Sequence, residues 1–331
     1  MTNRGLSIDN LSVAYADNLV VDRVDLTCPP GTVTAIVGPS GSGKSSLLRA
    51  CAGLITPRTG RILIDGVDAT RMPPHRRGIG MMFQSGALFS HMNVEANIGY
   101  GLRGISRAQR RERVRQLLDL VGLSGCERRD VATLSGGQAQ RVALARAIAP
   151  GGRALLLDEP LSALDRHLRG HLALEIRDII VRRDIAGLYV THDHDEAFAV
   201  ADYLAVMADG RLLIHGTPAD VWAQPGTREV AEFLGYGPFL DVLEAARWGF
   251  DESESAGRLL AIGPRAVTVG QGARSGRVCA VRDLKGSRRL DIEVEDASYR
   301  LRADVPPLTA IAADDRVDLA LDGSSCAWVS P

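Results

Sequence analysis

The sequence contains no apolar run that approaches the about 20 residues with which a helix crosses a lipid bilayer. Residues 1–10 also lack the apolar core of a secretory signal. From these two absences we expect the chain to remain in the cytoplasm. Any role at a membrane would then depend on a partner protein.

Two further absences argue against particular classes of function. The cysteines are scattered, odd in number and without a CxxC pair, so buried thiols in a reducing compartment are expected rather than a metal or redox site. There is also no basic excess, since 39 Lys and Arg stand against 40 Asp and Glu, which argues against a general nucleic-acid binder. The cysteines are Cys28, Cys51, Cys126, Cys279 and Cys326.

The chain does have enough length and apolar content for two domains, with 331 residues of which 45% are hydrophobic. Alternating apolar residues at 6–13 and 20–26 predict antiparallel strands. Nearly continuous apolar runs at 32–37, 154–157 and 187–191 predict strands buried on both faces. Helical segments separate these three runs, and each run ends in a polar or glycine-rich segment. We therefore predict an α/β fold whose site lies at the carboxyl ends of a parallel sheet.

Further along the chain, the pattern predicts a helical subdomain at about 89–146. Within it, Ser106 and Gln109 have the spacing of a capping box. The last part of the chain consists of short β-like runs, at 266–269, 277–281 and 290–294, separated by Gly, Ser and Asp turns. The sequence thus predicts an α/β domain over 1–237 and a small, β-barrel-like domain over 238–331. The second has no catalytic motif, so we expect it to regulate the first or to support a dimer.

The strongest chemical signal is the segment Gly-Pro-Ser-Gly-Ser-Gly-Lys-Ser at 38–45, which fits the phosphate-loop pattern GxxxxGK[ST] in full. Its glycines let the backbone wrap closely around phosphate, and the following helix adds its positive N-terminal end. Lys44 would supply a charge to the β- and γ-phosphates of ATP, and the Ser45 hydroxyl would bind Mg²⁺. The predicted ATP-binding residues here are Gly38, Pro39, Ser40, Gly41, Ser42, Gly43, Lys44, Ser45 and Ser46.

Two adjacent acids follow the apolar run that ends at Leu157. A buried strand that delivers two carboxylates to its C-terminal end fits a magnesium–nucleotide site. Asp158 is expected to hold Mg²⁺, as the acid on the second strand does in phosphate-loop enzymes. Glu159 is expected to act as the general base on the attacking water.

The segment Leu-Ser-Gly-Gly-Gln at 134–138 lies just ahead of a helical stretch and forms a second potential anion site at a helix N-terminus. A helix cap with a flexible glycine pair is the alternative interpretation. Because the chain has one lysine-bearing phosphate loop, we expect the second site to serve the nucleotide of another subunit. Its predicted residues are Ser135, Gly136, Gly137 and Gln138.

With this LSGGQ segment, the sequence resembles the nucleotide-binding subunits of ABC transporters. The resemblance implies that Tyr15 stacks on adenine and that Gln84 senses the γ-phosphate, Mg²⁺ and water. It also implies that His192 contacts the γ-phosphate and orients the catalytic Glu159. The segment Ser162–Asp165 resembles the one that joins the two sites across the dimer.

The resemblance covers roughly residues 6–235 and implies a phosphate-loop ATPase with Mg²⁺ that works as a homodimer. The implied partners are integral-membrane permease subunits at the cytoplasmic face and, indirectly, an extracytoplasmic solute-binding protein, with no nucleic acid. The segments 83–94 and 216–221 resemble importers of sugars, iron, sulfate and polyamines. The segment 194–200 is most similar to iron(III) importers, with thiamine and polyamine importers close behind. The tail weakly resembles the OB- or TOBE-like domain of that group.

Two other functions fit parts of this pattern. A soluble ABC ATPase that acts on ribosomes or nucleic acid would usually carry two cassettes or a long coiled coil, and the sequence shows one signature segment and no long heptad run. A regulatory protein could use the same fold without turnover, and measurable ATP hydrolysis would exclude it.

Overall fold

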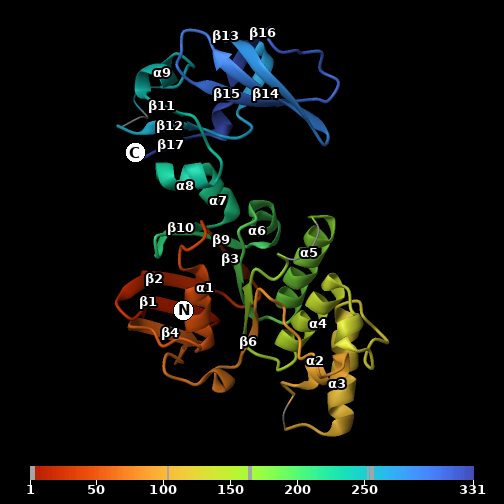
Figure 1. Ribbon diagram of the computed structural model, residues 1–331. Helices are drawn as coiled ribbons and strands as arrows, with labels where there is room; N and C mark the ends of the chain where they lie inside the picture. Colours follow the sequence, from red (N-terminus) through yellow and green to blue (C-terminus); the bar gives the residue numbers. More distant parts are fainter. Residues whose placement is uncertain (1–3, 103, 163–165, 252, 254–256) are drawn as a thin grey trace. The chain divides into compact units, whose positions relative to one another are not determined.

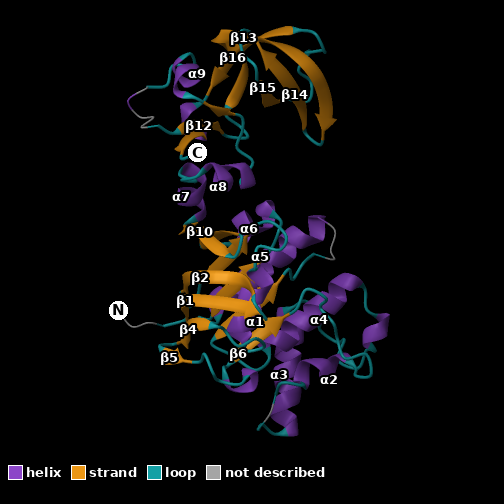
Figure 2. Cartoon of the chain, turned by 60° about the vertical axis from the view of Figure 1, so that its left-hand side comes forward, coloured by secondary structure: helices purple, strands orange, loops and turns teal. Residues whose placement is uncertain are grey.

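The computed structural model describes residues 4–102, 104–162, 166–251, 253 and 257–331. By its internal contacts the chain divides into two compact units, Met1–Pro218 and Ala219–Pro331. Figure 1 colours the chain along its length, and Figure 2 shows its helices and strands in a second view. The first unit contains all the residues for which sequence predicts a role in ATP binding or hydrolysis.

An antiparallel sheet in the order β2-β1-β4-β5 begins the first unit. The two strands predicted from alternation at 6–13 and 20–26 are confirmed, because β1 and β2 pair antiparallel from Leu6 opposite Cys28 to Tyr15 opposite Asn18. Their inward-facing apolar residues are buried in one core with those of β4. The strands are β1 (Leu6–Tyr15), β2 (Asn18–Cys28), β4 (Thr59–Ile64) and β5 (Val67–Asp68).

The second sheet of this unit has the order β10-β9-β3-β8-β7-β6. Strands β3, β8, β7 and β6 run parallel, β9 runs parallel to β3, and β10 returns antiparallel beside β9. Every residue of β3, β7 and β8 is buried, which confirms the three continuous apolar runs as central strands. The strands are β3 (Val33–Val37), β6 (Ile79–Met82), β7 (Ala154–Asp158), β8 (Ala186–Val190), β9 (Tyr203–Ala208) and β10 (Arg211–Gly216).

Helices flank this sheet, and in both views α2, α3 and α4 lie together at one side of the unit. The predicted capping box at the start of α3 is confirmed, since Ser106 and Gln109 exchange side-chain and backbone hydrogen bonds. Helix α1 packs against β7 and β8 and begins directly after the glycine-rich loop. The helices are α1 (Lys44–Ala52), α2 (Val94–Gly99), α3 (Arg107–Leu120), α4 (Gly136–Ile148), α5 (Arg166–Arg182) and α6 (His194–Val200).

A buried arginine holds the C-terminal end of α1. Arg77 is 5% exposed, and its guanidinium donates to the carbonyl oxygens of Ala50 and Cys51 in the last turn. It also donates to the carbonyls of Met72 and Thr70. One side chain thus binds four backbone acceptors, two of which are carbonyls of the last turn of α1, and the Ala50 carbonyl also accepts from the Gly53 amide.

We expect Arg77→Met to lower the free energy of unfolding by about 3 kcal/mol, because it removes four hydrogen bonds and leaves the buried carbonyl of Cys51 unpaired. The adjacent Arg76 is exposed, so Arg76→Met is the matched control and should change stability by less than about 0.5 kcal/mol. Urea denaturation followed by circular dichroism measures both. Equal midpoints for the two variants would contradict the proposed clamp on α1.

The second unit contains helices and two antiparallel sheets, β11-β12-β17 and β15-β14-β13-β16, around a core of its own. The β-rich tail is confirmed. Apart from Ala266, the apolar runs at 266–269 and 277–281 fall within one long strand, β13, which shifts register between Val269 and Arg274. The elements are α7 (Pro218–Ala223), α8 (Arg228–Phe233), β11 (Phe239–Leu240), α9 (Val242–Ala246), β12 (Leu259–Ile262), β13 (Val267–Leu284), β14 (Ser287–Val294), β15 (Arg300–Val305), β16 (Arg316–Leu321) and β17 (Cys326–Val329).

The division between the units lies ahead of the boundary after residue 237 that the sequence predicts. Helix α8 contacts β12, and Thr227 bridges Ser330 near the C-terminus, so this segment clusters with the strands that follow it. Among the described residues of both units, no helix is long and apolar enough to cross a membrane.

Candidate functional site

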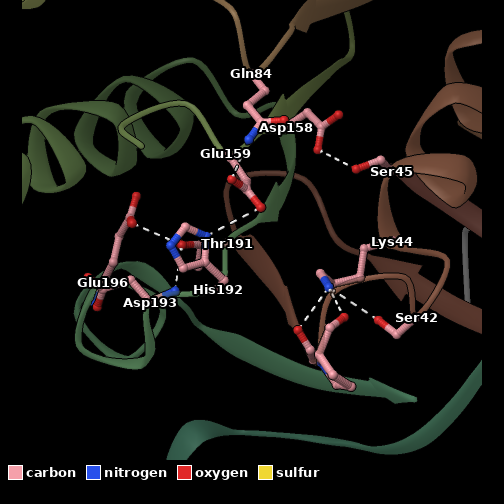
Figure 3. Close-up of polar contacts among 12 residues, drawn as sticks. Ser42, Lys44, Ser45, Gln84, Asp158, Glu159, Thr191, His192, Asp193 and Glu196 are labelled. Atoms are coloured by element: carbon pink, nitrogen blue, oxygen red, sulfur yellow. Dashed lines mark hydrogen bonds and ion pairs between the residues drawn. The ribbon is translucent and has the colours of Figure 1, made fainter. Parts of the chain in front are cut away.

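The site lies along the edge where the parallel strands of the first unit end. In the order β3, β8, β7 and β6, the strands lead into the loop at Gly38, the turn at Thr191 and His192, the acids Asp158 and Glu159, and Gln84. Adjacent strands therefore bring together residues from four distant parts of the chain. Figure 3 shows the side chains of Gln84, Asp158, Glu159, Thr191 and His192 together with those of Lys44 and Ser45.

The phosphate loop has the backbone that its glycines predict. Gly43 has a φ of 95° and caps α1, and a Cβ at this position would lie 2.3 Å from the carbonyl oxygen of Val20. Gly38 has a φ of 153°, and a Cβ there would lie 2.0 Å from the carbonyl oxygen of Met207. A side chain at either position would collide with backbone, so the wrapped loop requires glycine at both.

Lys44 lies inside this loop and is 7% exposed. Its Nζ donates to the carbonyl oxygens of Gly38 at 2.8 Å and Pro39 at 2.7 Å, and to Oγ of Ser42 at 3.2 Å. Burial lowers the pKa of Lys44, while the nearby carboxylates of Glu159 and Asp158 act in the opposite direction. A buried cation held by loop oxygens can transfer its hydrogen bonds to an incoming phosphate.

Ser45 and Asp158 form the part of the site that could hold a cation. The Ser45 hydroxyl donates to Oδ1 of Asp158 at 2.8 Å, and Asp158 is 3% exposed. Burial raises the pKa of Asp158, although the hydrogen bond from Ser45 lowers it. A hydroxyl and a carboxylate are hard oxygen donors, and Mg²⁺ typically takes one or two protein ligands and completes its shell with water and phosphate. The pair therefore fits Mg²⁺ better than a metal that needs a full protein cage.

Glu159 lies at the centre of the polar cluster. Nε2 of Gln84 donates to its Oε2 at 2.8 Å, and Nδ1 of His192 lies 3.3 Å from its Oε1. Its φ is 45°, a left-handed conformation that costs energy for any residue other than glycine. The Glu159 amide donates to the carbonyl of Val190 on the neighbouring strand, which holds this turn in place. The three residues that the sequence names as catalytic thus meet around one carboxylate.

Tyr15 lies at the end of β1, beside the first turn of α1. The residue is 45% exposed, and its hydroxyl lies 3.4 Å from Oγ of Ser46. An exposed aromatic ring next to a phosphate loop can stack on a planar base.

The LSGGQ segment has the geometry of a helix cap in this single chain. The Ser135 side chain accepts a hydrogen bond from the Gln138 amide, and the Gln138 side chain accepts one from the Ser135 amide. A Cβ on Gly136 would meet open space. Within the part of the chain that the structure describes, no hydrogen bond joins this segment to the phosphate loop. Its two glycines and helix N-terminus remain accessible to another molecule.

The segment predicted to join two sites, Ser162–Asp165, is described only at its first residue. The Ser162 amide donates to the carbonyl of Glu159 at 3.3 Å. Residues 163–165 lie outside the described part of the chain.

Sequence reasoning missed a buried polar cluster directly behind His192. Glu196, 7% exposed in the first turn of α6, accepts hydrogen bonds from the hydroxyls of Tyr189 and Thr191. Burial raises the pKa of Glu196, although both hydroxyl donors lower it. Asp193 caps α6 through the Glu196 amide. An acid three residues after a potential cap is the signal that could have pointed to this cluster.

Comparisons with known proteins agree with this geometry. The ABC transporter family profile matches residues 21–162. An Fe(3+) ions import ATP-binding protein, FbpC, of Streptomyces avermitilis is 41% identical, over 96% of this chain and 96% of that protein. A putative 2-aminoethylphosphonate import ATP-binding protein, PhnT, of Salmonella typhimurium is 46% identical over 75% of this chain and 68% of its own. The chain therefore belongs to the ABC transporter family, among the ATP-binding subunits of importers, which are ATPases coupled to transport.

A solved structure is similar as well. It is described as the dimeric structure of a post-hydrolysis state of the ATP-binding cassette MJ0796 bound to ADP and Pi. It superposes with a TM-score of 0.58 at 26% identity, over 64% of this chain and 98% of its own. The predicted fold, an ABC cassette with a parallel core sheet, an antiparallel β subdomain and a helical subdomain, is confirmed.

Proposed function

We propose that the chain binds Mg²⁺-ATP at the carboxyl edge of the β3-β8-β7-β6 sheet and hydrolyses it with Glu159 as the general base. The observation that carries the proposal is the Glu159 carboxylate, which Gln84 and His192 contact on its two oxygens. A carboxylate oriented in this way can accept a proton from water as it attacks the γ-phosphate.

The other residues supply binding and orientation. Lys44 and the amides of the loop at 38–46 would hold the phosphates, and Ser45 with Asp158 would hold the cation. Mg²⁺, when bound, neutralises charge on the phosphate oxygens. His192 would keep the Glu159 carboxylate aligned and meet the γ-phosphate, and Gln84 would link that carboxylate to the cation site.

We further propose that the working site is shared between two copies of the chain, with Ser135, Gly136, Gly137 and Gln138 supplied by the second copy. In support, the LSGGQ segment is an exposed helix N-terminus capped only by its own residues in the single chain, and the similar MJ0796 cassette is a dimer with ADP and Pi. Two half-sites would then close on each nucleotide, and hydrolysis would let the copies separate.

For the solute, we propose iron(III). The FbpC relatives of Streptomyces avermitilis and Streptomyces coelicolor, at 41% and 50% identity, are named for Fe(3+) import, whereas the PhnT relative is named for 2-aminoethylphosphonate. The partners would be integral-membrane permease subunits, which hold the chain at the cytoplasmic face of the membrane, and indirectly an extracytoplasmic binding protein. The segment 238–331 would regulate this ATPase.

Uptake in cells that lack the chain tests this assignment. Deletion should abolish ATP-dependent uptake of radiolabelled iron(III), and the wild-type chain should restore it while Glu159→Gln should not. Unchanged iron uptake together with lost 2-aminoethylphosphonate uptake would replace the proposed solute. Purified chain that hydrolyses no ATP, alone or with its permease, would overturn the proposed activity itself.

Tyr15→Ala is expected to raise the KM for ATP by less than tenfold, with kcat within about twofold of wild type, since ring stacking is worth about 1 kcal/mol. Tyr15→Phe keeps the ring, loses the hydroxyl near Ser46 and is the matched control. Steady-state ATPase assays give both constants. If Tyr15→Phe raised KM as much as Tyr15→Ala, the hydroxyl contact would account for the effect and stacking would not.

A further inference from the structure

We propose that Glu196 and Thr191 are positioning residues that fix the backbone on both sides of His192 and so hold its imidazole against Glu159. The inference rests on the proposed hydrolytic role of His192 and Glu159. It assigns a function to a buried carboxylate that binding and hydrolysis of ATP do not otherwise use.

The imidazole of His192 is exposed and therefore needs other groups to hold it in position. Its side chain is 58% exposed, and among the described residues the carboxylate of Glu159, at 3.3 Å, is its one hydrogen-bond or ion-pair partner. An exposed imidazole with a single polar contact is not fixed by its own packing. Its position therefore depends on the backbone of the turn between β8 and α6.

Thr191 binds that turn on both sides of the histidine. Its hydroxyl donates to Oε2 of Glu196 at 2.9 Å and accepts a hydrogen bond from the Asp193 amide at 3.0 Å. The side chain of the residue before His192 thus holds the backbone of the residue after it, as Figure 3 shows. Thr191 is 2% exposed, so water does not compete for these bonds.

Glu196 anchors this arrangement to the strand and the helix. Its other oxygen accepts from the hydroxyl of Tyr189, which is fully buried on β8. Its amide donates to Oδ1 of Asp193, whose Oδ2 pairs with Arg169 of α5 at 2.7 Å. The turn that carries His192 is thereby connected to β8, α6 and α5.

The simpler interpretation is that the cluster only stabilises the fold. The two interpretations differ in what they predict for a variant that already lacks the imidazole. A residue that acts through His192 has no further effect on turnover once His192 is gone, whereas an independent contribution adds to that loss.

The test uses Thr191→Val, which keeps the volume and removes the hydroxyl. We expect kcat to fall about tenfold, with the KM for ATP within about twofold, and Thr191→Ser to restore it. In the His192→Ala background, Thr191→Val should change kcat by less than about twofold. The control is Thr34→Val, at an equally buried threonine on β3 that makes no hydrogen bond to this cluster, and it should leave kcat unchanged.

A second measurement does not depend on turnover. In the protein without nucleotide, the Asp193 amide should exchange with deuterium about tenfold faster in Thr191→Val than in wild type or Thr34→Val, because its acceptor is lost. Unchanged exchange would overturn the positioning role even if the chain proved not to hydrolyse ATP. So would an added loss of kcat in the His192→Ala background, or an unaltered kcat in Thr191→Val.

Discussion

Replacing Glu159 with glutamine is expected to lower ATP turnover by roughly a hundredfold or more while ATP still binds. The amide is similar in size, but it cannot accept the proton of the attacking water, and general-base catalysis is worth about this factor. The variant should also accumulate as an ATP-bound dimer, because hydrolysis is the step that lets the copies separate. Size-exclusion chromatography with and without ATP measures this, and turnover is measured on the same sample.

The shared site predicts how a second substitution acts on the stalled dimer. Ser135→Arg in the Glu159→Gln background should prevent the dimer and leave ATP binding to the monomer intact. Ser106 caps α3 through the same capping box by which Ser135 caps α4, so Ser106→Arg is a matched control for the lost cap. If Glu159→Gln stayed monomeric at saturating ATP, or if both arginine variants behaved alike, the shared site would be wrong for this protein.

Lys44→Ala is expected to weaken ATP binding by roughly a hundredfold, since a charge-assisted hydrogen bond contributes up to about 3 kcal/mol. It also removes the three bonds by which Nζ ties together the loop at Gly38, Pro39 and Ser42. Isothermal titration calorimetry with ATP measures the affinity, and a thermal melt establishes that the variant is folded.

The chain offers an unusually clear control for this experiment. The sequence contains only two lysines, Lys44 and Lys285, and the second lies in the turn between β13 and β14 of the other unit. Lys285→Ala should bind ATP with wild-type affinity. A folded Lys44→Ala with unchanged affinity would remove the phosphate loop from the proposed site.

Three strands were predicted from the sequence because their burial is uniform. The central strands β3, β7 and β8 are buried along their whole length, and a continuous apolar run is the direct consequence of that environment. Strands β6 and β10 are only partly buried and were not predicted. Strand β9 was also missed, although it is buried at every residue after Tyr203 and carries an apolar run. The long strand β13 was divided in two because the stretch near its register shift contains Gly270 and Gly272.

The sequence predicts some residues of the site better than others, depending on whether they are contiguous in the chain. The phosphate loop is contiguous, so its spacing is visible in the sequence, whereas the contact between Gln84 and Glu159 spans 75 residues and was implied only by family resemblance. The bonds of Thr191 and Glu196 depend on how a strand end meets the next helix, which residue spacing does not specify.

The strand order has a consequence for how the chain is made. The phosphate loop follows β3, yet the parallel neighbours of β3 are β8 and β9, so Val33 pairs with Gly187 and Thr34 with Tyr203. Such pairings close loops of about 150 residues and form slowly. During synthesis, β3 leaves the ribosome long before either neighbour exists, so both of its hydrogen-bonding edges stay unpaired in the meantime. We therefore expect the ability to bind ATP to arise late in synthesis, when the last parallel strands join the sheet.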